Sequence, residues 1–158
     1  MSKDANELRW VRAFSPNVIP KYLIEQIKDR DYTVDNFYAY QEVNLYSRGD
    51  KGPVLNPFNH LYALVDKENI VKGMMWYVLD ILSKDIVINT FSVDKEYWGG
   101  GKAVECASKH IKKILNDLDL NKVYWITKRP KHSEKYGFKR SKNVIMEYKR
   151  EDKDGKHS

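Results

Sequence analysis

One stretch of the sequence constrains the fold more than any other, because a β-rich run, three consecutive glycines and a helical pattern follow each other directly. Residues Asp85–Val93 (DIVINTFSV) are dense in β-branched and aromatic side chains, which predicts a strand. Gly99, Gly100 and Gly101 follow a short link, and from 103 to 118 apolar residues recur at helical spacing. The start of a helix presents unpaired backbone N–H groups and the positive end of the helix dipole. The pattern therefore predicts a turn that binds a phosphate group.

The residues at this turn narrow the prediction. Lys102 adds a positive charge beside the glycines, and glycine lets a phosphate approach the backbone closely because it has no Cβ. Neither the P-loop pattern G-x-x-x-x-G-K-S/T nor the dinucleotide pattern G-x-G-x-x-G occurs here. A flexible turn that uses glycine only for its positive φ is the alternative interpretation.

The other segments predict one mixed α/β domain over residues 1–150. Runs of β-forming residues predict strands at 8–14, 61–65, 70–82, 123–127 and 144–148. Helical spacing predicts helices at 18–27 and 35–47, a short helix or turn is expected at 130–136, and the stretch 49–57, which carries glycine and proline, is expected to be a loop. Asp66–Asn69 predicts the turn of a hairpin, and the charged tail 151–158 is expected to be disordered. The expected element order is β-α-α-β-β-β-α-β-α-β.

Composition limits the class of protein. Hydrophobic residues make up 42% of the 158 residues, enough for a core, and no apolar run approaches the roughly 18 residues of a membrane span. The N-terminus lacks the apolar stretch of a signal peptide. The single cysteine, Cys106, excludes an intramolecular disulfide and a cysteine-based zinc site, and its helical spacing predicts a core residue. We therefore expect a cytoplasmic protein with no membrane partner and no metal.

Positive charge gathers in the second part of the chain. The net charge is +6, and residues 101–158 hold 16 basic against 8 acidic side chains. Such a distribution indicates an anionic partner, either a nucleic acid or a small polyphosphate, unless the lysines only solvate the surface. No RRM, KH or helix-turn-helix signature is found, so no motif supports nucleic-acid binding.

Two motifs resemble those of the GNAT N-acetyltransferase superfamily. The family pattern Val-x-Pro-x-x-Arg-Gly-x-Gly-x-Gly/Ala follows the fourth strand, and the stretch VDKEYWGGGKA matches it at Val93, Gly99, Gly101 and Ala103. The second family motif, Tyr-x-x-x-Gly-Phe-Lys, is matched by SEKYGFK at Gly137, Phe138 and Lys139. The element order also fits, and the resemblance extends from residue 8 to residue 148.

The resemblance implies a mixed, mostly antiparallel sheet flanked by helices, with acetyl-CoA as the co-substrate. It assigns contacts with acetyl-CoA to Ser92, Val93, Trp98, Gly99, Gly100, Gly101, Lys102, Ala103, Lys128 and Arg129. In this assignment the backbone N–H of Val93 donates to the thioester oxygen, as in an oxyanion hole. Trp98 stands where the family has Arg or Gln, so one contact with the pyrophosphate is left to backbone N–H groups.

Candidate acids and bases follow from the same resemblance. Ser133 stands where many members have a general-acid tyrosine, and Tyr136 lies nearby, so both hydroxyls are candidates for the acid. Asp85 opens the strand where some members carry a catalytic carboxylate, and its alternative interpretation is a surface acid at a strand end. Glu96, His60 and His132 are weaker candidates for the base, and a water molecule is a further alternative.

These residues imply an acetyl-CoA-dependent N-acetyltransferase that moves an acetyl group to a primary amine of a small molecule, a protein or a nucleic-acid-linked acceptor. The alternative is a catalytically weak module of the same fold that binds acyl-CoA or a macromolecular partner. A homodimer is left open. An aromatic set predicts either core packing or a pocket for the acceptor: Phe37, Tyr38, Tyr40, Tyr46, Phe58 and Tyr62.

Overall fold

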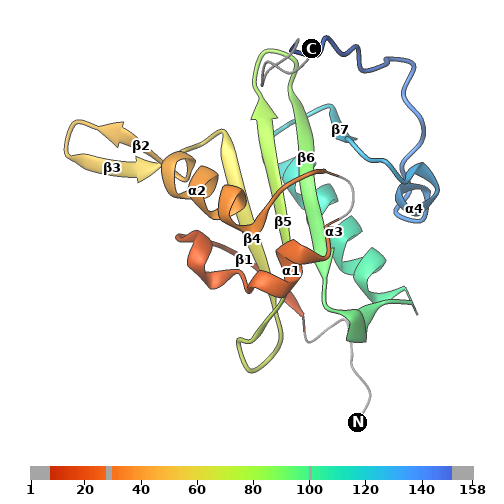
Figure 1. The fold of residues 1–158 in the computed structure, drawn as a ribbon, viewed down its shortest axis with the longest axis horizontal. Helices are drawn as coiled ribbons and strands as arrows, with labels where there is room; N and C mark the ends of the chain where they lie inside the picture. Colours follow the sequence, from red (N-terminus) through yellow and green to blue (C-terminus); the bar gives the residue numbers. More distant parts are fainter. Residues whose placement is uncertain (1–7, 28–29, 100, 151–158) are drawn as a thin grey trace, which may run out of the picture.

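A five-stranded sheet forms the centre of the molecule in the computed structural model, which describes residues 8–27, 30–99 and 101–150 (Figure 1). Across the sheet the strands are β1 (Arg9–Arg12), β4 (Asn59–Val65), β5 (Val71–Asp80), β6 (Asp85–Val93) and β7 (Lys122–Trp125). All neighbouring pairs are antiparallel except β6 and β7, which are parallel. The expected mixed, mostly antiparallel sheet is therefore confirmed.

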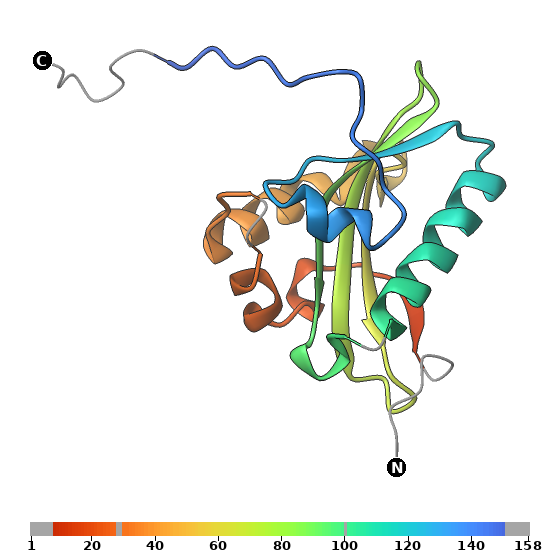
Figure 2. The same ribbon diagram turned by 90° about the vertical axis from the view of Figure 1, so that its right-hand side faces the viewer.

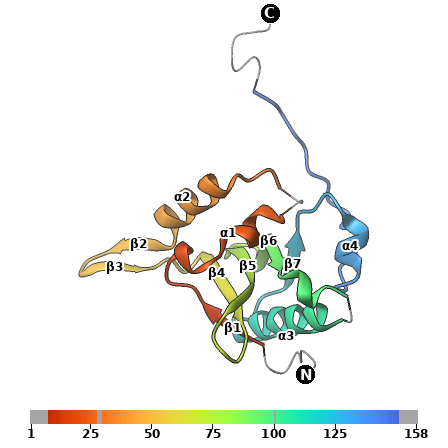
Figure 3. The ribbon, with the colours of Figure 1, turned by 60° about the horizontal axis from the view of Figure 1, so that its bottom comes forward.

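Helices cover both faces of this sheet (Figures 2 and 3). On one face lie α1 (Lys21–Glu25) and α2 (Val34–Asn44), after the 3₁₀ turn η2 (Pro16–Val18). On the other face lies α3 (Lys102–Asp117), which makes the long crossover that the parallel strands β6 and β7 require. The short helix α4 (Pro130–Glu134) follows β7, and the 3₁₀ turn η3 (Lys95–Tyr97) follows β6.

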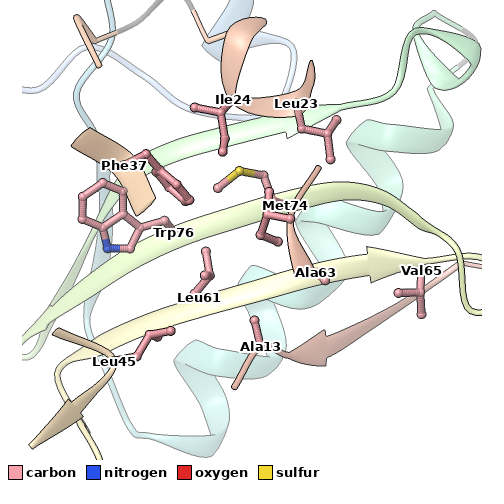
Figure 4. Packing of buried hydrophobic residues seen from close by; sticks show 11 residues of the cluster. Ala13, Leu23, Ile24, Phe37, Leu45, Leu61, Ala63, Val65, Met74 and Trp76 are labelled. Atoms are coloured by element: carbon pink, nitrogen blue, oxygen red, sulfur yellow. The ribbon is translucent and has the colours of Figure 1, made fainter. Parts of the chain in front are cut away.

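The core has two layers because the sheet is covered on both sides. Successive residues of β5 point to opposite faces, so Met74 and Trp76 pack against α1 and α2 while Met75 and Tyr77 pack beneath α3. Figure 4 shows the first layer, with Ile24, Leu23 and Phe37 over Met74 and Trp76. Burying one such side chain contributes about 1.5–3 kcal/mol, so the two layers fix the helices on the sheet.

Two expectations about secondary structure are wrong. The loop expected at 49–57 belongs instead to a hairpin of β2 (Tyr46–Gly49) and β3 (Gly52–Leu55), which extends to one side of the molecule (Figure 1). The strand expected at 144–148 is not formed: the segment has no regular structure and its side chains are exposed. A strand needs a neighbouring strand to pair its backbone groups, and the intrinsic β preference of a segment does not supply one. The tail 151–158 lies outside the described residues.

Within the described ranges, no helix has the length and apolar character needed to cross a bilayer. In the same ranges, no three side chains of histidine, cysteine, aspartate or glutamate come together in a group that could hold a metal ion.

Candidate functional site

β6 and β7, the two parallel strands at one side of the sheet, separate halfway along β6. β6 and β7 pair over four positions, from Asp85 opposite Lys122 to Ile88 opposite Trp125. β6 continues to Val93, paired over this length only with β5 among the described strands. The register between β5 and β6 shifts by one residue at Asn89, and such a bulge bends and twists the strand that carries it. The second half of β6 therefore has one edge that pairs with no strand of the described residues.

The separation of β7 from β6 leaves an opening beside the second half of β6. Backbone groups of β6 are directed into this opening. The N–H of Asp94 donates to the carbonyl of Lys72, which precedes Gly73 in β5 (2.8 Å). Because backbone groups alternate between the two edges of a strand, the N–H groups of Phe91 and Val93 are directed away from β5. The carbonyl of Val93 lies on the same edge, where it accepts hydrogen bonds from Gln26 Nε2 (3.0 Å) and Trp98 Nε1 (2.8 Å). This direction supports the prediction that the N–H of Val93 is available to an acyl oxygen.

The end of β6 is held in place from α1. The Ser92 hydroxyl donates to the carbonyl of Leu23 (2.6 Å) and accepts from Gln26 Nε2 (3.1 Å), so this predicted cofactor residue uses its side chain to anchor the strand. Tyr22 donates its hydroxyl to Asp94 (2.6 Å). Burial and this hydrogen bond to a carboxylate raise the pKa of the Tyr22 hydroxyl. These contacts fix the strand end from which the glycine turn begins.

The glycine turn leads into a helix whose first N–H groups have no side-chain cap. Gly99 and Gly101 both have left-handed φ, +76° and +82°, and Gly101 is the N-cap residue of α3. Side chains cap η2, α2 and η3, whereas no side chain of the described residues caps α3. Beyond the adjoining residues, no atom of the described residues lies within 4 Å of a Cβ placed on Gly99 or Gly101, so the turn is open to an incoming group. Gly100 lies outside the described residues.

Residues beside the turn divide between the core and the surface. Ala103, in the first turn of α3, is buried. Lys102, the first residue of α3, is partly exposed. The ring of Trp98, in the place of the family's arginine or glutamine, is 59% exposed, with the Lys95 ammonium 5.8 Å from its centre. Because its indole N–H is bonded to the carbonyl of Val93, the ring is held over the end of β6.

An aromatic cluster closes one side of the opening. Phe91 of β6, Trp125 of β7 and Tyr136 after α4 lie edge to face, with ring centres 5.4–6.0 Å apart. Ser133, in α4, is buried, and among the described residues neither its hydroxyl oxygen nor Trp125 Nε1 has a hydrogen-bond partner. Burial raises the pKa of the Tyr136 hydroxyl. The structure thus brings both candidate acids beside the opening, with Tyr136 also packing as a core residue.

Two of the candidate bases, Asp85 and His60, lie away from the opening, whereas Glu96 follows the end of β6. Asp85 begins β6 and Val93 ends it, so about 26 Å of strand separates them at roughly 3.3 Å per residue. Asp85 is buried, and one of its carboxylate oxygens has no hydrogen-bond partner among the described residues, so its role as base stays a prediction. Glu96 forms an ion pair with Lys72 (2.7 Å). His60 is buried against Tyr77 on the α3 face of the sheet, and burial lowers its pKa. The structure therefore does not bring Asp85 or His60 to the opening.

The basic residues after β7 lie on the α4 side of the opening. Lys128 forms an ion pair with Asp31 (2.9 Å), at the connection between α1 and α2. Arg129 is the N-cap residue of α4, and its backbone N–H donates to Thr127 Oγ1 (2.9 Å). Their predicted contacts with a cofactor therefore stay predictions. His132, in α4, has its ring against Trp125 and Tyr136.

Cys106 is a core residue, whereas the residues of the aromatic set are divided between the core and the surface. Cys106 is buried in the core, its carbonyl accepts from the Trp10 indole (3.1 Å), and burial raises the pKa of its thiol, which agrees with a core residue. Phe37 is a core residue, whereas Tyr40, Tyr46 and Phe58 are exposed, so the aromatic set does not act as one group. The sequence reasoning missed Phe91 and Trp125, because their contact depends on the pairing of strands far apart in the chain.

Comparison with known proteins identifies the fold. No protein-family model matches the sequence, and no curated protein matches it. A solved structure described as a possible acetyltransferase from Clostridium difficile 630 superposes with a TM-score of 0.65 at 13% identity, covering 90% of this chain and 97% of that chain. A variant of the spermidine N-acetyltransferase from Vibrio cholerae superposes with a TM-score of 0.62 at 12% identity, covering 84% and 77%. At such identities the likeness is one of fold: this chain has the fold of the GNAT acetyltransferases.

Proposed function

We propose that this protein is an acetyl-CoA-dependent N-acetyltransferase that acts on a primary amine. The observation that carries the proposal is the separation of β6 from β7 after Ile88, which leaves a free strand edge leading into an open glycine turn. The two similar solved structures are described as acetyltransferases, and an amine is the acceptor that the name of one of them specifies. A cytoplasmic location belongs to the same proposal.

The residues of the turn and the strand edge fit acetyl-CoA. The uncapped start of α3, at Gly101, Lys102 and Ala103, would hold the pyrophosphate through backbone N–H groups and the helix dipole. The open space above Gly99 and Gly101 allows the phosphates to approach the backbone. On the edge of β6 that faces away from β5, the Val93 carbonyl is already bonded to Gln26 and Trp98, so the backbone groups of Phe91 would bind the amides of the pantetheine arm, as an edge strand binds an added peptide.

The chemistry needs little beyond positioning. Acetyl-CoA supplies an acetyl group activated as a thioester. The N–H of Val93 would donate to the acyl oxygen where negative charge develops, and one good donor of this kind contributes about 3–4 kcal/mol. The amine must reach the site neutral, and a water molecule is a nearer proton acceptor than Asp85, which lies at the other end of β6. Holding the amine and the thioester together supplies much of the remaining rate.

Neither of the two candidate acids, Ser133 and Tyr136, is well suited to protonate the leaving thiolate near neutral pH. The Ser133 hydroxyl is a weak acid, and burial moves the pKa of Tyr136 further above neutrality. We therefore propose that the thiolate leaves without an obligatory acid. The substitutions at Ser133 and Trp98 favour one alternative function, a module of this fold that binds acyl-CoA with little turnover.

A paired experiment separates these functions. Calorimetric titration with acetyl-CoA measures binding, and release of free thiol in the presence of a polyamine, a lysine peptide, an amino sugar or a free peptide N-terminus measures transfer. Saturable binding together with amine-dependent thiol release supports the N-acetyltransferase. Binding without thiol release for any amine supports the binding module, and the absence of binding contradicts both.

A further inference from the structure

A cationic side chain that the proposed function does not use lies at the point where β6 and β7 separate. Ile88 is the last residue of β6 that pairs with β7, and Asn89 follows it at the bulge. Arg30, in the connection between α1 and α2, donates from its guanidinium to Asn89 Oδ1 (3.0 Å). Figures 1 and 3 show the residues just before α2 passing over β6. The guanidinium therefore lies at the closed end of the opening, and the glycine turn lies at the other end.

The partners that hold the Arg30 guanidinium in place are neutral. Its central carbon lies 5.8 Å from the centre of the Tyr32 ring, and that ring packs against Trp76 with ring centres 5.5 Å apart. The bond to Asn89 uses one of the five N–H donors of an arginine, and no carboxylate of the described residues pairs with Arg30. Arginine binds a carboxylate or a phosphate through two parallel hydrogen bonds. The guanidinium is therefore available to an anionic group of a ligand.

The acidic side chains that follow β6 or adjoin Arg30 among the described residues already have partners: Asp94 with the Tyr22 hydroxyl (2.6 Å), Glu96 with Lys72 (2.7 Å) and Asp31 with Lys128 (2.9 Å). A polyamine needs free carboxylates to pair with its ammonium groups, whereas the opening presents a like charge at Arg30. The charges around the opening thus favour an acceptor that is not a polycation.

We propose that the acceptor is a primary amine that also carries an anionic oxygen group, a carboxylate or a phosphate, which Arg30 binds. This inference rests on the proposed function and names the class of its substrate. Asn89 and Val93 are separated along β6 by about 13 Å, at 3.3 Å per residue. The amine must reach the acyl group near Val93 while the anionic group stays at Arg30, so a chain of several bonds must join the two groups. An ω-amino carboxylate meets this requirement, and an α-amino acid does not.

Arg30 orients the acceptor in this account and takes no part in the bond changes. The amine loses a proton to water, and its neutral nitrogen forms the amide bond with the acetyl carbon. The thioester C–S bond breaks, and its electron pair leaves on the sulfur of coenzyme A. The proton that the nitrogen loses on forming the amide passes through water to this thiolate, which gives the free thiol. Loss of Arg30 should therefore raise the KM for the acceptor and change kcat little.

Matched acceptors measure what the anionic group contributes. The pair ε-aminocaproate and ε-aminocaproamide share one chain and one amine and differ in the charge at the other end. For the wild type, kcat/KM is expected to be about 10- to 100-fold higher for the acid, the effect of one charge-assisted pair. Aminohexyl phosphate against hexylamine tests a phosphate in the same way, and glycine and spermidine should be poorer acceptors than the acid. Equal values for the acid and the amide, or a preference for spermidine, would overturn the proposal.

Variants assign the preference to Arg30. Arg30→Gln removes the charge and should abolish the preference for the acid through a higher KM, whereas Arg30→Lys should retain part of it. Asn89→Asp keeps the arginine but supplies a carboxylate beside it, so the preference should be lost here too. The control Arg48→Gln changes an exposed arginine of the β2–β3 hairpin and should leave the preference unchanged. A preference that survives in Arg30→Gln would contradict the assignment.

Binding measurements separate a failure of this inference from a failure of the proposed function. Acetyl-CoA titration should give the same affinity for Arg30→Gln as for the wild type, which also shows that the variant is folded. If no amine releases thiol, the proposed transfer fails. Titration of ε-aminocaproate and its amide into protein saturated with coenzyme A then tests Arg30 alone. Tighter binding of the acid supports the inference, and equal binding of the two overturns it.

Discussion

Replacing Gly101 with valine is expected to separate cofactor binding from folding. Gly101 has a φ of +82°, where a residue with a side chain costs roughly 1–2 kcal/mol because its Cβ approaches its own backbone. Beyond the adjoining residues, no described atom lies within 4 Å of the new Cβ, so no further clash adds to this cost. A loss of that size lowers the melting temperature by about 2–8 °C in a domain of this length. The fold should therefore survive.

Binding is expected to suffer more than stability. The valine side chain enters the open space through which the phosphates approach the backbone, and each charge-assisted hydrogen bond lost costs about 1.5–3 kcal/mol. The loss of two such bonds weakens acetyl-CoA binding by more than about 100-fold, which calorimetric titration measures directly. Gly52→Val is the matched control, because Gly52 also has a positive φ (+119°) and an open Cβ position but lies in the β2–β3 hairpin. If Gly101→Val binds like the wild type, or both variants lose binding equally, the turn is not the phosphate site.

The other predictions concern the candidate acids and a buried histidine. Ser133→Ala should keep most of the thiol-release activity and Tyr136→Phe should lose part of it, whereas an obligatory acid would cost about 10²–10⁴-fold in kcat at unchanged acetyl-CoA affinity. Burial lowers the pKa of His110, stacked on Trp10 at 4.9 Å, to about 4. Because the unfolded chain takes up this proton near pH 6.5 and the folded protein does not, stability is complete above pH 6.5 and falls as the pH drops towards 4, by about 2 kcal/mol at pH 5. Urea unfolding at pH 7.5 and 5 measures this loss, and a His110→Phe variant that shows the same loss would refute its assignment to this residue.

Local patterns in the sequence were sufficient to predict the centre of the site. The strand expected at Asp85–Val93 has these bounds in the structure, and the glycine turn and the helix follow where expected. Each of these signals lies within a few residues: β-branched side chains, a run of glycine, and apolar residues at a helical period. The hairpin after Asp66 was predictable for the same reason, and Asn69 takes the left-handed conformation that closes it.

Features that depend on distant residues could not be predicted in this way. The point at which β6 leaves β7 is set by the register between strands more than thirty residues apart and by the bulge at Asn89. The aromatic cluster of Phe91, Trp125 and Tyr136 depends on that register. Asp85 is near the glycine turn in the chain, yet the extended strand takes it to the opposite end of the sheet. The segment 144–148 has a strand's composition, yet it pairs with no strand among the described residues.

The central claim is that the turn after β6 and the free strand edge hold acetyl-CoA, and calorimetric titration of the wild-type protein tests it most directly. We expect saturable binding of one acetyl-CoA per chain, with weaker binding of NAD and ATP. Acetyl-CoA at 100 times its dissociation constant should add about 2.7 kcal/mol to the free energy of unfolding. No heat of binding with acetyl-CoA, or equal binding of NAD and ATP, would contradict the claim.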